Sequence, residues 1–451
     1  MAAPRDPTAR RAERAHSLYD SLTGLPARPL VEHRLAAACR EAAADPASGG
    51  SVALYIVDID KMRLVNEVYG HTRGDLLIQE TARRLALAVR RQDVVGRTAG
   101  GAFLVVVPAI TGAAEAMEIG RRFCAAVCGP LRLGDTELYV SASFGLAVWP
   151  QDGQEPADLM RAAEAACEHA KQAGGGQCAS YSDSMTDRAR RRMRLDTELR
   201  RAVRDRAFHL NYQPRIDTRT GKVVCVEALI RWRMRDGTMV PPAEFIPVAE
   251  ATGMIGIIGE WVLDAACRQL VAWDREGIGL PQVAVNLSAL QLRQDDIVQV
   301  VRRVLRDCGV APQRLELELT ESMVVEDTAV VVRNLDDLRR LGTHLALDDF
   351  GTGYSSLAML KSLPLTTLKI DRGFVAGCVE DPRDAGITAA VLQLARAFRL
   401  TTVAEGVERA DQVAVLAAQG CDQLQGYHIC RPQMPEAVAA FLLERGAAPA
   451  A

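Results

Sequence analysis

The chain has 451 residues, of which 49% are hydrophobic and 25% are charged, a composition typical of a globular protein and not of a disordered or fibrous one. Its length suits two or three domains, and its formal net charge of -3 offers no basic field to nucleic acid or to an anionic membrane. No stretch approaches the roughly 18 apolar residues of a membrane span, so we expect none.

Residues 1–18 are rich in alanine, arginine and proline and predict a disordered tail. No apolar segment follows these arginines, so the tail is not typical of a secretory signal. The eleven cysteines form no C-x-x-C pair. We therefore expect a cytoplasmic protein whose cysteines are small, reduced, buried residues.

Residues 19–183 form a first block of alternating strand and helix patterns. A buried-strand pattern, SVALYIVDID, precedes an amphipathic helix predicted over 74–91, and a hairpin-like run, GRTAGGAFLVVVP, follows. A further strand (YVSASFGLAVWP) and helix (ADLMRAAEAACEHAKQAG) come later. This order predicts a compact α/β sheet domain. The arginine-rich residues 184–206 after it predict a solvated helical linker.

A different rhythm marks the second block, residues 195–445. Short β-rich runs alternate with helical segments, beginning with HLNYQPRID and continuing with CVEALIRW, QVAVNLSA, RLELELTES, HLALDDFG, TTLKIDR, TTVAEGVE and LQGYHIC. Eight strands over about 240 residues predict a (β/α)8 TIM-like barrel. The expected fold class is therefore α/β with two different domains.

Polar side chains stand where the strands of the second block are predicted to end. They are Glu227, Asn286, Glu318, Glu321, Asp348, Asp349, Lys369, Glu405 and Gln425. In a barrel these ends converge on one face, where clustered carboxylates repel one another unless cations lie between them. Oxygen ligands favour Mg²⁺ or Mn²⁺, and two such ions about 3.5–4 Å apart clamp a phosphodiester for in-line attack. The pattern therefore predicts two-metal phosphoester hydrolysis.

Each of these residues also has a purely structural interpretation. A lone glutamate such as Glu227 is more often a surface or ion-paired residue, and Asp348 and Asp349 would serve equally well to cap a loop. Lys369 would serve equally well as a structural ion-pair partner, and Asn286 could close a turn. The same coincidence on successive strands is much less expected, which favours the metal site.

The order of these residues resembles the EAL-domain phosphodiesterases over nearly the whole second block. The matching motifs are Glu227-Ala228-Leu229 with Arg231, Asn286-Leu287-Ser288, Glu318-Leu319-Thr320-Glu321, Asp348-Asp349-Phe350-Gly351-Thr352-Gly353-Tyr354-Ser355-Ser356, Lys369-Ile370-Asp371, Glu405-Gly406-Val407-Glu408 and Gln425-Gly426-Tyr427. No position that the family needs for catalysis departs from its pattern. The resemblance implies a barrel that cleaves cyclic di-GMP to linear pGpG.

The resemblance also implies roles for individual residues. One ion would be held by Glu227, Asn286, Glu318 and Asp348, and the second by Asp348, Asp349 and Glu405. Lys369 would hold and help to activate the water, with Glu321 also at the cluster. Arg231, Gln425 and Asp349 would contact the substrate. The choice of base, Glu405 or a lysine-assisted water, stays open. Glu408 would anchor the mobile loop 349–356, and a homodimer through this domain is expected.

The first block resembles a GGDEF diguanylate cyclase domain. The matching motifs are Asp20-Ser21-Leu22-Thr23-Gly24-Leu25-Pro26, Asp58-Ile59-Asp60, Asn66, Tyr69-Gly70-His71, Gly74-Asp75, Ser143-Phe144-Gly145 and Ala170-Lys171. The signature itself has changed: the chain reads Ala99-Gly100-Gly101-Ala102-Phe103, without either acidic residue. Loss of a metal carboxylate predicts a degenerate domain without cyclase activity.

Ligand binding by this degenerate domain has two alternatives. In the family Asp58 binds metal, Asn66 and Asp75 read guanine and Lys171 approaches phosphate, so GTP could still bind as a regulator. The other interpretation is a structural relic or a dimerisation module. Arg90 and Asp93 fit the family's R-x-x-D inhibitory site for cyclic di-GMP, although so short a pattern also arises by chance.

Three functions are therefore compared: an active phosphodiesterase, which the residues favour, a sensor that binds cyclic di-GMP without cleaving it, and a bifunctional cyclase and phosphodiesterase. A sensor would require a missing ligand in the second block, where every motif is present. A bifunctional enzyme would require the carboxylates that Gly101 and Ala102 replace.

Overall fold

The structure is a computed structural model that describes residues 18–44, 50–98, 100–133, 136–321, 323, 329–351 and 357–446. The predicted disordered tail lies outside these residues, apart from Leu18. The chain divides into two compact units, Met1–Arg192 and Met193–Ala451, which are described separately below.

Unit 1 is built on a five-stranded sheet with the order β2-β3-β1-β6-β7. Its strands are β1 (Ser51–Ile59), β2 (Val94–Arg97), β3 (Ala102–Ile110), β6 (Ala142–Trp149) and β7 (Cys178–Ser180). The central strand β1 runs antiparallel to both β3 and β6. A separate two-stranded ribbon joins β4 (Gly129–Leu133) to β5 (Thr136–Val140). The predicted α/β sheet is thus present.

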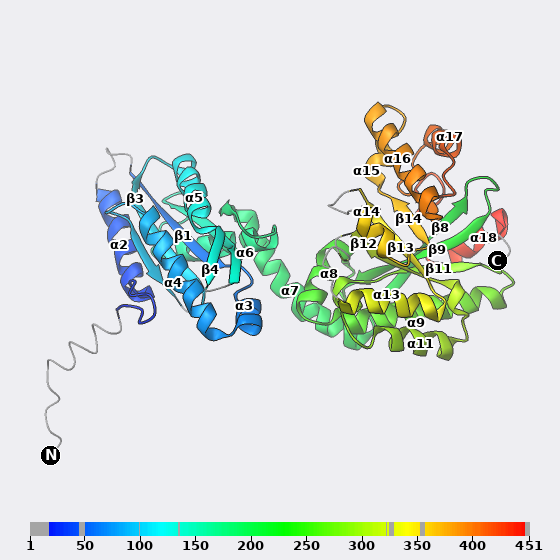
Figure 1. Cartoon of the computed structure of the whole chain (residues 1–451), viewed down its shortest axis with the longest axis horizontal. Helices are drawn as coiled ribbons and strands as arrows, with labels where there is room; N and C mark the ends of the chain where they lie inside the picture. Colours follow the sequence, from blue (N-terminus) through cyan, green and yellow to red (C-terminus); the bar gives the residue numbers. More distant parts are fainter. Residues whose placement is uncertain are drawn as a thin grey trace, which may run out of the picture. The chain divides into compact units, whose positions relative to one another are not determined.

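Helices cover both faces of this sheet, because the apolar side chains of β1 alternate between its two sides. Ala53, Tyr55 and Val57 pack with α4 (His71–Ala88) and α5 (Ala113–Val127), whereas Leu54 and Ile56 pack with α2 (Arg28–Ala44) and α6 (Pro156–Gln172). The short helix α3 (Met62–Tyr69) precedes α4 (Figure 1). The helix predicted over 74–91 begins and ends three residues earlier than expected.

The arginine-rich helix is α7 (Asp183–Asp205). It is helical as predicted, but it is not solvated throughout. Leu195, Leu199 and Ala202 from its second half are buried in the core of unit 2. These three residues are four and three positions apart, a spacing that places them on one face of the helix. The many arginines around them obscured this pattern in the sequence.

Unit 2 is a closed barrel of β8 and β9 with β11 to β16 (Figure 1). The strands are β8 (Phe208–Asp217), β9 (Val223–Arg233), β11 (Gln282–Asn286), β12 (Leu315–Thr320), β13 (His344–Phe350), β14 (Thr367–Ile370), β15 (Thr401–Ala404) and β16 (Gln423–Leu424). A short strand, β10 (Met239–Val240), pairs with β9 outside the barrel. The predicted set of strands is confirmed, and each strand overlaps its predicted run, although β8 and β9 extend beyond theirs and β16 shares only Leu424 with its run.

The all-parallel arrangement implied by a (β/α)8 barrel is wrong at one strand. β8 runs antiparallel to both of its neighbours, β9 and β16, whereas the other neighbouring strands of the barrel are parallel. The reason is the short connection from β8 to β9: only residues 218–222 separate them, which is enough for a hairpin but not for a crossover helix.

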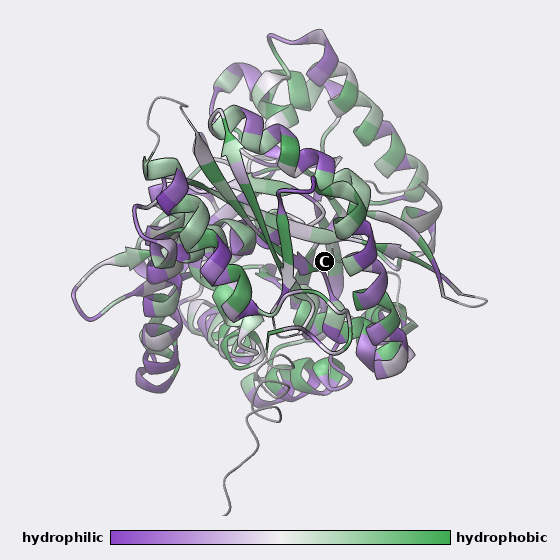
Figure 2. Cartoon of the chain, turned by 90° about the vertical axis from the view of Figure 1, so that its left-hand side faces the viewer, coloured by the Kyte–Doolittle hydropathy of each residue, from purple (hydrophilic) through white to green (hydrophobic). Residues whose placement is uncertain are grey.

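Helices surround the barrel. They are α8 (Pro242–Ala251), α9 (Ile255–Arg275), α10 (Ala289–Leu292), α11 (Ile297–Cys308), η2 (Pro312–Arg314), α13 (Ala329–Leu341), α14 (Leu357–Ser362), α15 (Arg372–Gly377), α16 (Pro382–Phe398), α17 (Ala410–Gln419) and α18 (Pro435–Arg445). The helices drawn in Figure 2 carry both hydrophobic and hydrophilic residues. This matches a core between the strands and the inner faces of the helices.

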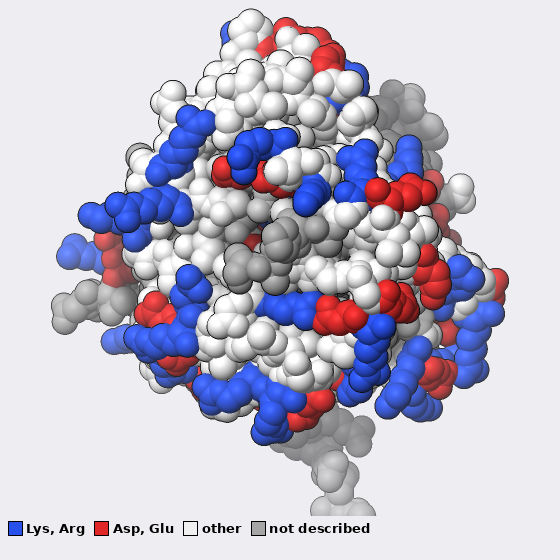
Figure 3. Space-filling view, turned by 90° about the vertical axis from the view of Figure 1, so that its right-hand side faces the viewer, with Lys and Arg blue, Asp and Glu red and all other residues white. Residues whose placement is uncertain are grey.

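No helix within the described parts of the chain is long and apolar enough to cross a membrane. Side chains of both signs are interspersed over the face drawn in Figure 3. This distribution accords with the small net charge of -3.

Candidate active site

A buried lysine stands at the centre of the polar side chains of the barrel. Lys369 on β14 is 0% exposed, and its Nζ lies 2.8 Å from Glu318 Oε2, 3.0 Å from Asp348 Oδ2 and 2.5 Å from Glu405 Oε1. Glu227 Oε2 is 3.9 Å away. The strands β9, β12, β13 and β14, and the residue after β15, therefore bring the predicted residues together.

Negative charge exceeds positive charge in this cluster. With all four carboxylates ionised, they would exceed the one ammonium by three charges (four minus one) among these five groups. Burial and the neighbouring Glu227 raise the pKa of Glu318 well above its ordinary value, and burial raises the pKa of Glu405 to about 7. Glu318 Oε1 is buried and has no hydrogen-bond partner in the described structure. The cluster therefore fits additional cations.

Asp348 and Asp349 reach the same site although they are consecutive residues of a strand. In a regular strand their side chains would point to opposite faces. Here the register of β13 with β14 shifts between Leu347 and Phe350, and Asp349 adopts a left-handed backbone with φ 54°. Oxygen atoms of Asp348, Asp349 and Glu405 consequently lie within 4.8 Å of one another. This bulge was not predicted, because the sequence shows only the pair of aspartates.

Glu227 lies in the middle of β9 and not at its end, which corrects the expectation from the sequence. The reason is that β9 extends beyond the barrel: its parallel neighbour β11 pairs only as far as Ala228, while Trp232 still pairs with Phe208 of β8. At that level Glu227 Oε1 accepts from Asn286 Nδ2 at 2.7 Å, and its Oε2 accepts from Gln425 Nε2 at 2.6 Å.

Glu321 directly follows β12 and is not among the carboxylates that pair with Lys369 in the described part of the chain. Its side chain is 2% exposed, and its Oε2 accepts a hydrogen bond from the backbone N–H of Gly351 at 3.0 Å. Residues 352–356, which Glu408 was expected to anchor, lie outside the described residues. Glu408 itself is exposed, and its backbone N–H donates to Gln412.

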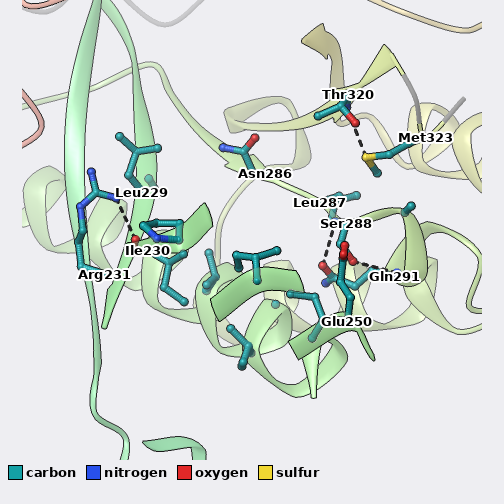
Figure 4. Close-up of a pocket in the computed structure, with 18 residues that line it drawn as sticks. Leu229, Ile230, Arg231, Glu250, Asn286, Leu287, Ser288, Gln291, Thr320 and Met323 are labelled. Atoms are coloured by element: carbon teal, nitrogen blue, oxygen red, sulfur yellow. Dashed lines mark hydrogen bonds between the residues drawn. The ribbon is translucent and has the colours of Figure 1, made fainter. Parts of the chain in front are cut away.

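A cavity of about 440 Å³ adjoins the cluster through Asn286 (Figure 4). It is lined by Leu229 and Arg231 of β9, by Glu250 of α8, and by residues of α9 and of the β11–α10 connection. Its volume lies in the range of small-molecule sites. Arg231 is half-buried, and its Nη1 donates to the carbonyl of Ile230 at 2.9 Å. The cavity thus combines an apolar wall with one cation beside the acidic cluster.

Two family descriptions match this architecture. The description "EAL domain" matches residues 196–432, more than half of the chain, and "Diguanylate cyclase, GGDEF domain" matches residues 17–177. The chain belongs to the EAL domain family. Its N-terminal unit carries the GGDEF domain in tandem with it.

Characterised relatives share this tandem arrangement. The bifunctional diguanylate cyclase/cyclic di-GMP phosphodiesterase MucR of Pseudomonas aeruginosa is 40% identical over 420 residues, which are 93% of this chain and 61% of MucR. The cyclic di-GMP phosphodiesterase PdeR of Escherichia coli is 34% identical over 414 residues, or 92% of this chain and 61% of PdeR. This chain thus spans about three-fifths of the length of these relatives.

A solved structure resembles the barrel. The PaMucR phosphodiesterase in complex with c-di-GMP is 43% identical, with a TM-score of 0.52, and covers 54% of this chain and 99% of its own. The likeness is therefore to the EAL domain alone.

In the GGDEF domain, two of the predicted nucleotide-binding residues pair with each other. Lys171 Nζ lies 2.8 Å from Asp58 Oδ2. Burial works to lower the pKa of Lys171, but the ion pair with Asp58 outweighs it, and the pKa is raised. Asp58 pairs across the sheet with Ala102, a position at which the sequence predicts a missing acid. Both residues line a cavity of about 230 Å³ with Lys171.

The other predicted residues of this domain have local roles. Asn66 Oδ1 is buried without a hydrogen-bond partner in the described structure, and it lies where a Cβ on Gly74 would come within 2.0 Å. Asp75 is exposed on α4. Asp93 Oδ2 accepts from the backbone N–H of Arg90 at 2.7 Å, which closes a turn. Burial raises the pKa of Asp93.

Three polar residues inside the barrel were missed by the sequence analysis. They are Gln213, Arg215 and Glu316, with exposures of 7%, 1% and 1%. Gln213 Oε1 accepts from Gln425 Nε2 at 3.2 Å, and Arg215 pairs with Glu316 at 2.7 Å. The alternation of RLELELTE was the available signal, because Glu316 and Glu318 are two residues apart and share one face of β12.

Proposed function

We propose that this chain is a cyclic di-GMP phosphodiesterase that hydrolyses its substrate to linear pGpG with two divalent cations in the EAL domain. The observation that carries the proposal is the convergence of Glu227, Glu318, Asp348 and Glu405 on Lys369. Relatives named as cyclic di-GMP phosphodiesterases, PdeR among them, support the substrate. The barrel of MucR, solved with c-di-GMP, supports it further.

The cluster fits Mg²⁺ or Mn²⁺, because its ligands are hard oxygens with excess negative charge. One ion would be held by Glu227, Asn286, Glu318 and Asp348, and the other by Asp348, Asp349 and Glu405. When bound, the pair lowers the pKa of a coordinated water and neutralises charge on the phosphoryl oxygens.

The chain's own side chains supply orientation and proton transfer. Lys369 donates to Glu318 and Asp348, so it fixes both carboxylates and holds a positive charge where the attacking water would lie. Glu405, with a pKa raised to about 7 by burial, could accept a proton near neutral pH. Arg231, at the wall of the adjoining cavity, would bind a substrate phosphate, with Gln425 and Asp349 beside it.

We further infer that the GGDEF domain lacks cyclase activity. Gly101 and Ala102 stand where the family carries acids, and Asp58 is paired with Lys171. A single carboxylate of the metal pair would remain, which leaves the second ion without its ligand. The domain's role would be regulatory, through GTP or cyclic di-GMP, or structural. Dimerisation through the EAL domain is likewise part of the proposal.

A bifunctional enzyme is the second candidate, since MucR carries both activities in its name. One experiment separates the candidates. The purified chain is incubated with cyclic di-GMP and, separately, with GTP, each with Mg²⁺ or Mn²⁺, and the products are chromatographed. We expect pGpG from the first substrate and no cyclic di-GMP from GTP. Binding of cyclic di-GMP without pGpG under either metal would favour a sensor, and cyclic di-GMP made from GTP would establish the bifunctional enzyme.

A further inference from the structure

A second layer of polar side chains lies below the candidate active site inside the barrel. Inward-facing positions on one strand are two residues apart, so each site residue has a neighbour one layer down. The vertical neighbours are Gln213 and Arg215 on β8, Glu227 and Cys225 on β9, Glu318 and Glu316 on β12, and Lys369 and Thr367 on β14. Arg215 belongs to the lower layer because β8 is antiparallel: it pairs with Cys225, whereas Gln213 pairs with Glu227.

Arg215 is the cation of this lower layer. Its side chain is 2% exposed, and its Nη2 donates to Glu316 Oε1 at 2.7 Å. The other oxygen of Glu316 accepts from Thr367 Oγ1 at 2.7 Å. Ala284 and Ala346, two residues below Asn286 and Asp348, are fully buried. Barrel interiors are usually filled by branched apolar side chains, so an ion pair here is unusual.

The guanidinium also faces a predicted metal ligand. Arg215 Nη1 lies 3.7 Å from Glu318 Oε1, and both atoms are buried without a hydrogen-bond partner among the described residues. That distance is too long for a hydrogen bond, but the two opposite charges still form an ion pair. Glu318 therefore stands between two cations, with Oε2 on Lys369 and Oε1 turned toward Arg215.

Stability alone gives a weak reason for this arrangement. Moving two charges into a barrel core costs several kcal/mol per ion, and apolar replacements of a buried pair are often neutral or stabilising. An orienting role gives a stronger reason, because partners behind a metal ligand fix its geometry.

We propose that Arg215 is a positioning residue for the candidate metal site, which holds the Glu318 carboxylate from below while Glu316 orients the guanidinium. This inference rests on the proposed function, since it assigns Glu318 to a divalent cation. The fixed fork of the guanidinium suits the task, because one group can face both glutamates at once.

The test is Mn²⁺ affinity, measured by calorimetry on the full chain. The variant Arg215→Met/Glu316→Leu removes both charges of the pair and leaves no unpaired ion. We expect it to fold and to bind Mn²⁺ about 10–100-fold more weakly than the wild type. The control variant Arg314→Met/Asp274→Leu removes another ion pair of unit 2, at 2.6 Å on the outside of the barrel, and should bind Mn²⁺ like the wild type.

Each outcome decides the inference. Equal Mn²⁺ affinity in the wild type and the Arg215 double variant would overturn the positioning role alone. A wild type that binds no Mn²⁺ would overturn the proposed metal site, and the inference with it. If the double variant does not fold, Arg215→Lys serves instead, because it keeps the charge but loses the fork. We expect weaker Mn²⁺ binding with an unchanged near-ultraviolet circular dichroism spectrum, and wild-type affinity would contradict the proposal.

Discussion

Burial and neighbouring charges act against each other at Glu405. Burial raises the pKa of its carboxyl to about 7, although Lys369 lies 2.5 Å away and favours the charged form. Burial outweighs the lysine because the other carboxylates share that same ammonium. A carboxyl group that titrates near neutrality is suited to proton transfer, and this is the residue-scale basis for placing Glu405 at the reaction centre.

The raised pKa of Glu405 predicts a pH dependence of stability in the metal-free protein. The folded state holds this proton more tightly than the unfolded chain, whose pKa is near 4.5, so the free energy of unfolding falls as pH rises from about 4.5 to 7. The loss is on the order of 3 kcal/mol, and Glu405→Gln should remove it. Chelator-treated protein would be unfolded in urea at a series of pH values, with the exposed Glu276→Gln as control. An unchanged slope in Glu405→Gln would contradict the assignment.

Residue identity was the most predictable part of the site. The sequence predicted that Glu318, Asp348 and Glu405 lie together with Lys369. In the structure an oxygen of each of the three carboxylates lies within 3.0 Å of the Lys369 Nζ. Partners that depend on three-dimensional layers, such as Arg215, were not predictable. The pairing of β8 with β9 places Gln213 level with Glu227 and Arg215 level with Cys225, and no pattern within a single strand reveals this pairing.

At the scale of elements, local irregularities decide which side chains reach the site. The shifted register of β13 and the left-handed backbone of Asp349 turn two consecutive carboxylates toward one point. The extension of β9 past its neighbour β11 leaves Glu227 in mid-strand. Strand periodicity predicts neither feature, since both arise from pairing with other strands. It did predict the order and approximate limits of the strands, because those follow from apolar runs along the chain.

Gly426 illustrates how tightly the strand ends are packed. A Cβ at this position would lie 2.1 Å from the backbone oxygen of Val407, and Gly426 follows Gln425, which donates to Glu227. We expect Gly426→Ala to lower the free energy of unfolding by about 1–3 kcal/mol. We also expect it to reduce hydrolysis about 10–100-fold, because the partner of a metal ligand moves.

The matched control is Gly386→Ala within α16, where a Cβ would meet nothing within 4 Å. It should be neutral or stabilise the protein by up to about 1 kcal/mol, since alanine is the better helix former. Urea denaturation and product chromatography on both variants measure the two effects. Equal behaviour of the two alanine variants would refute the packing argument.

At the scale of the whole molecule, the predicted ligands of the two divalent ions all lie in unit 2. Saturation at about 100 times the dissociation constant adds about 2.7 kcal/mol per site, or about 5 kcal/mol for both sites, to the stability of that unit alone. In calorimetry we expect Mn²⁺ to raise one unfolding transition by about 10–20 °C and to leave the other in place. A shift of both transitions would indicate a metal site in the GGDEF domain, contrary to the loss of its acids.

We propose that the acidic cluster around Lys369 hydrolyses cyclic di-GMP, and substitution of Glu227 tests this activity at its metal site. Glu227→Ala removes one carboxylate, together with the acceptor of Asn286 and Gln425. Initial rates of pGpG formation with Mn²⁺ would be measured for the wild type, for Glu227→Ala and for the exposed control Glu276→Ala. We predict that Glu227→Ala forms pGpG more than about 100-fold more slowly than the wild type, because losing a metal ligand lowers the rate more than losing one of its outer partners. The rate of the control Glu276→Ala should be unchanged. Wild-type turnover by a folded Glu227→Ala would show that this cluster does not hold the catalytic metal.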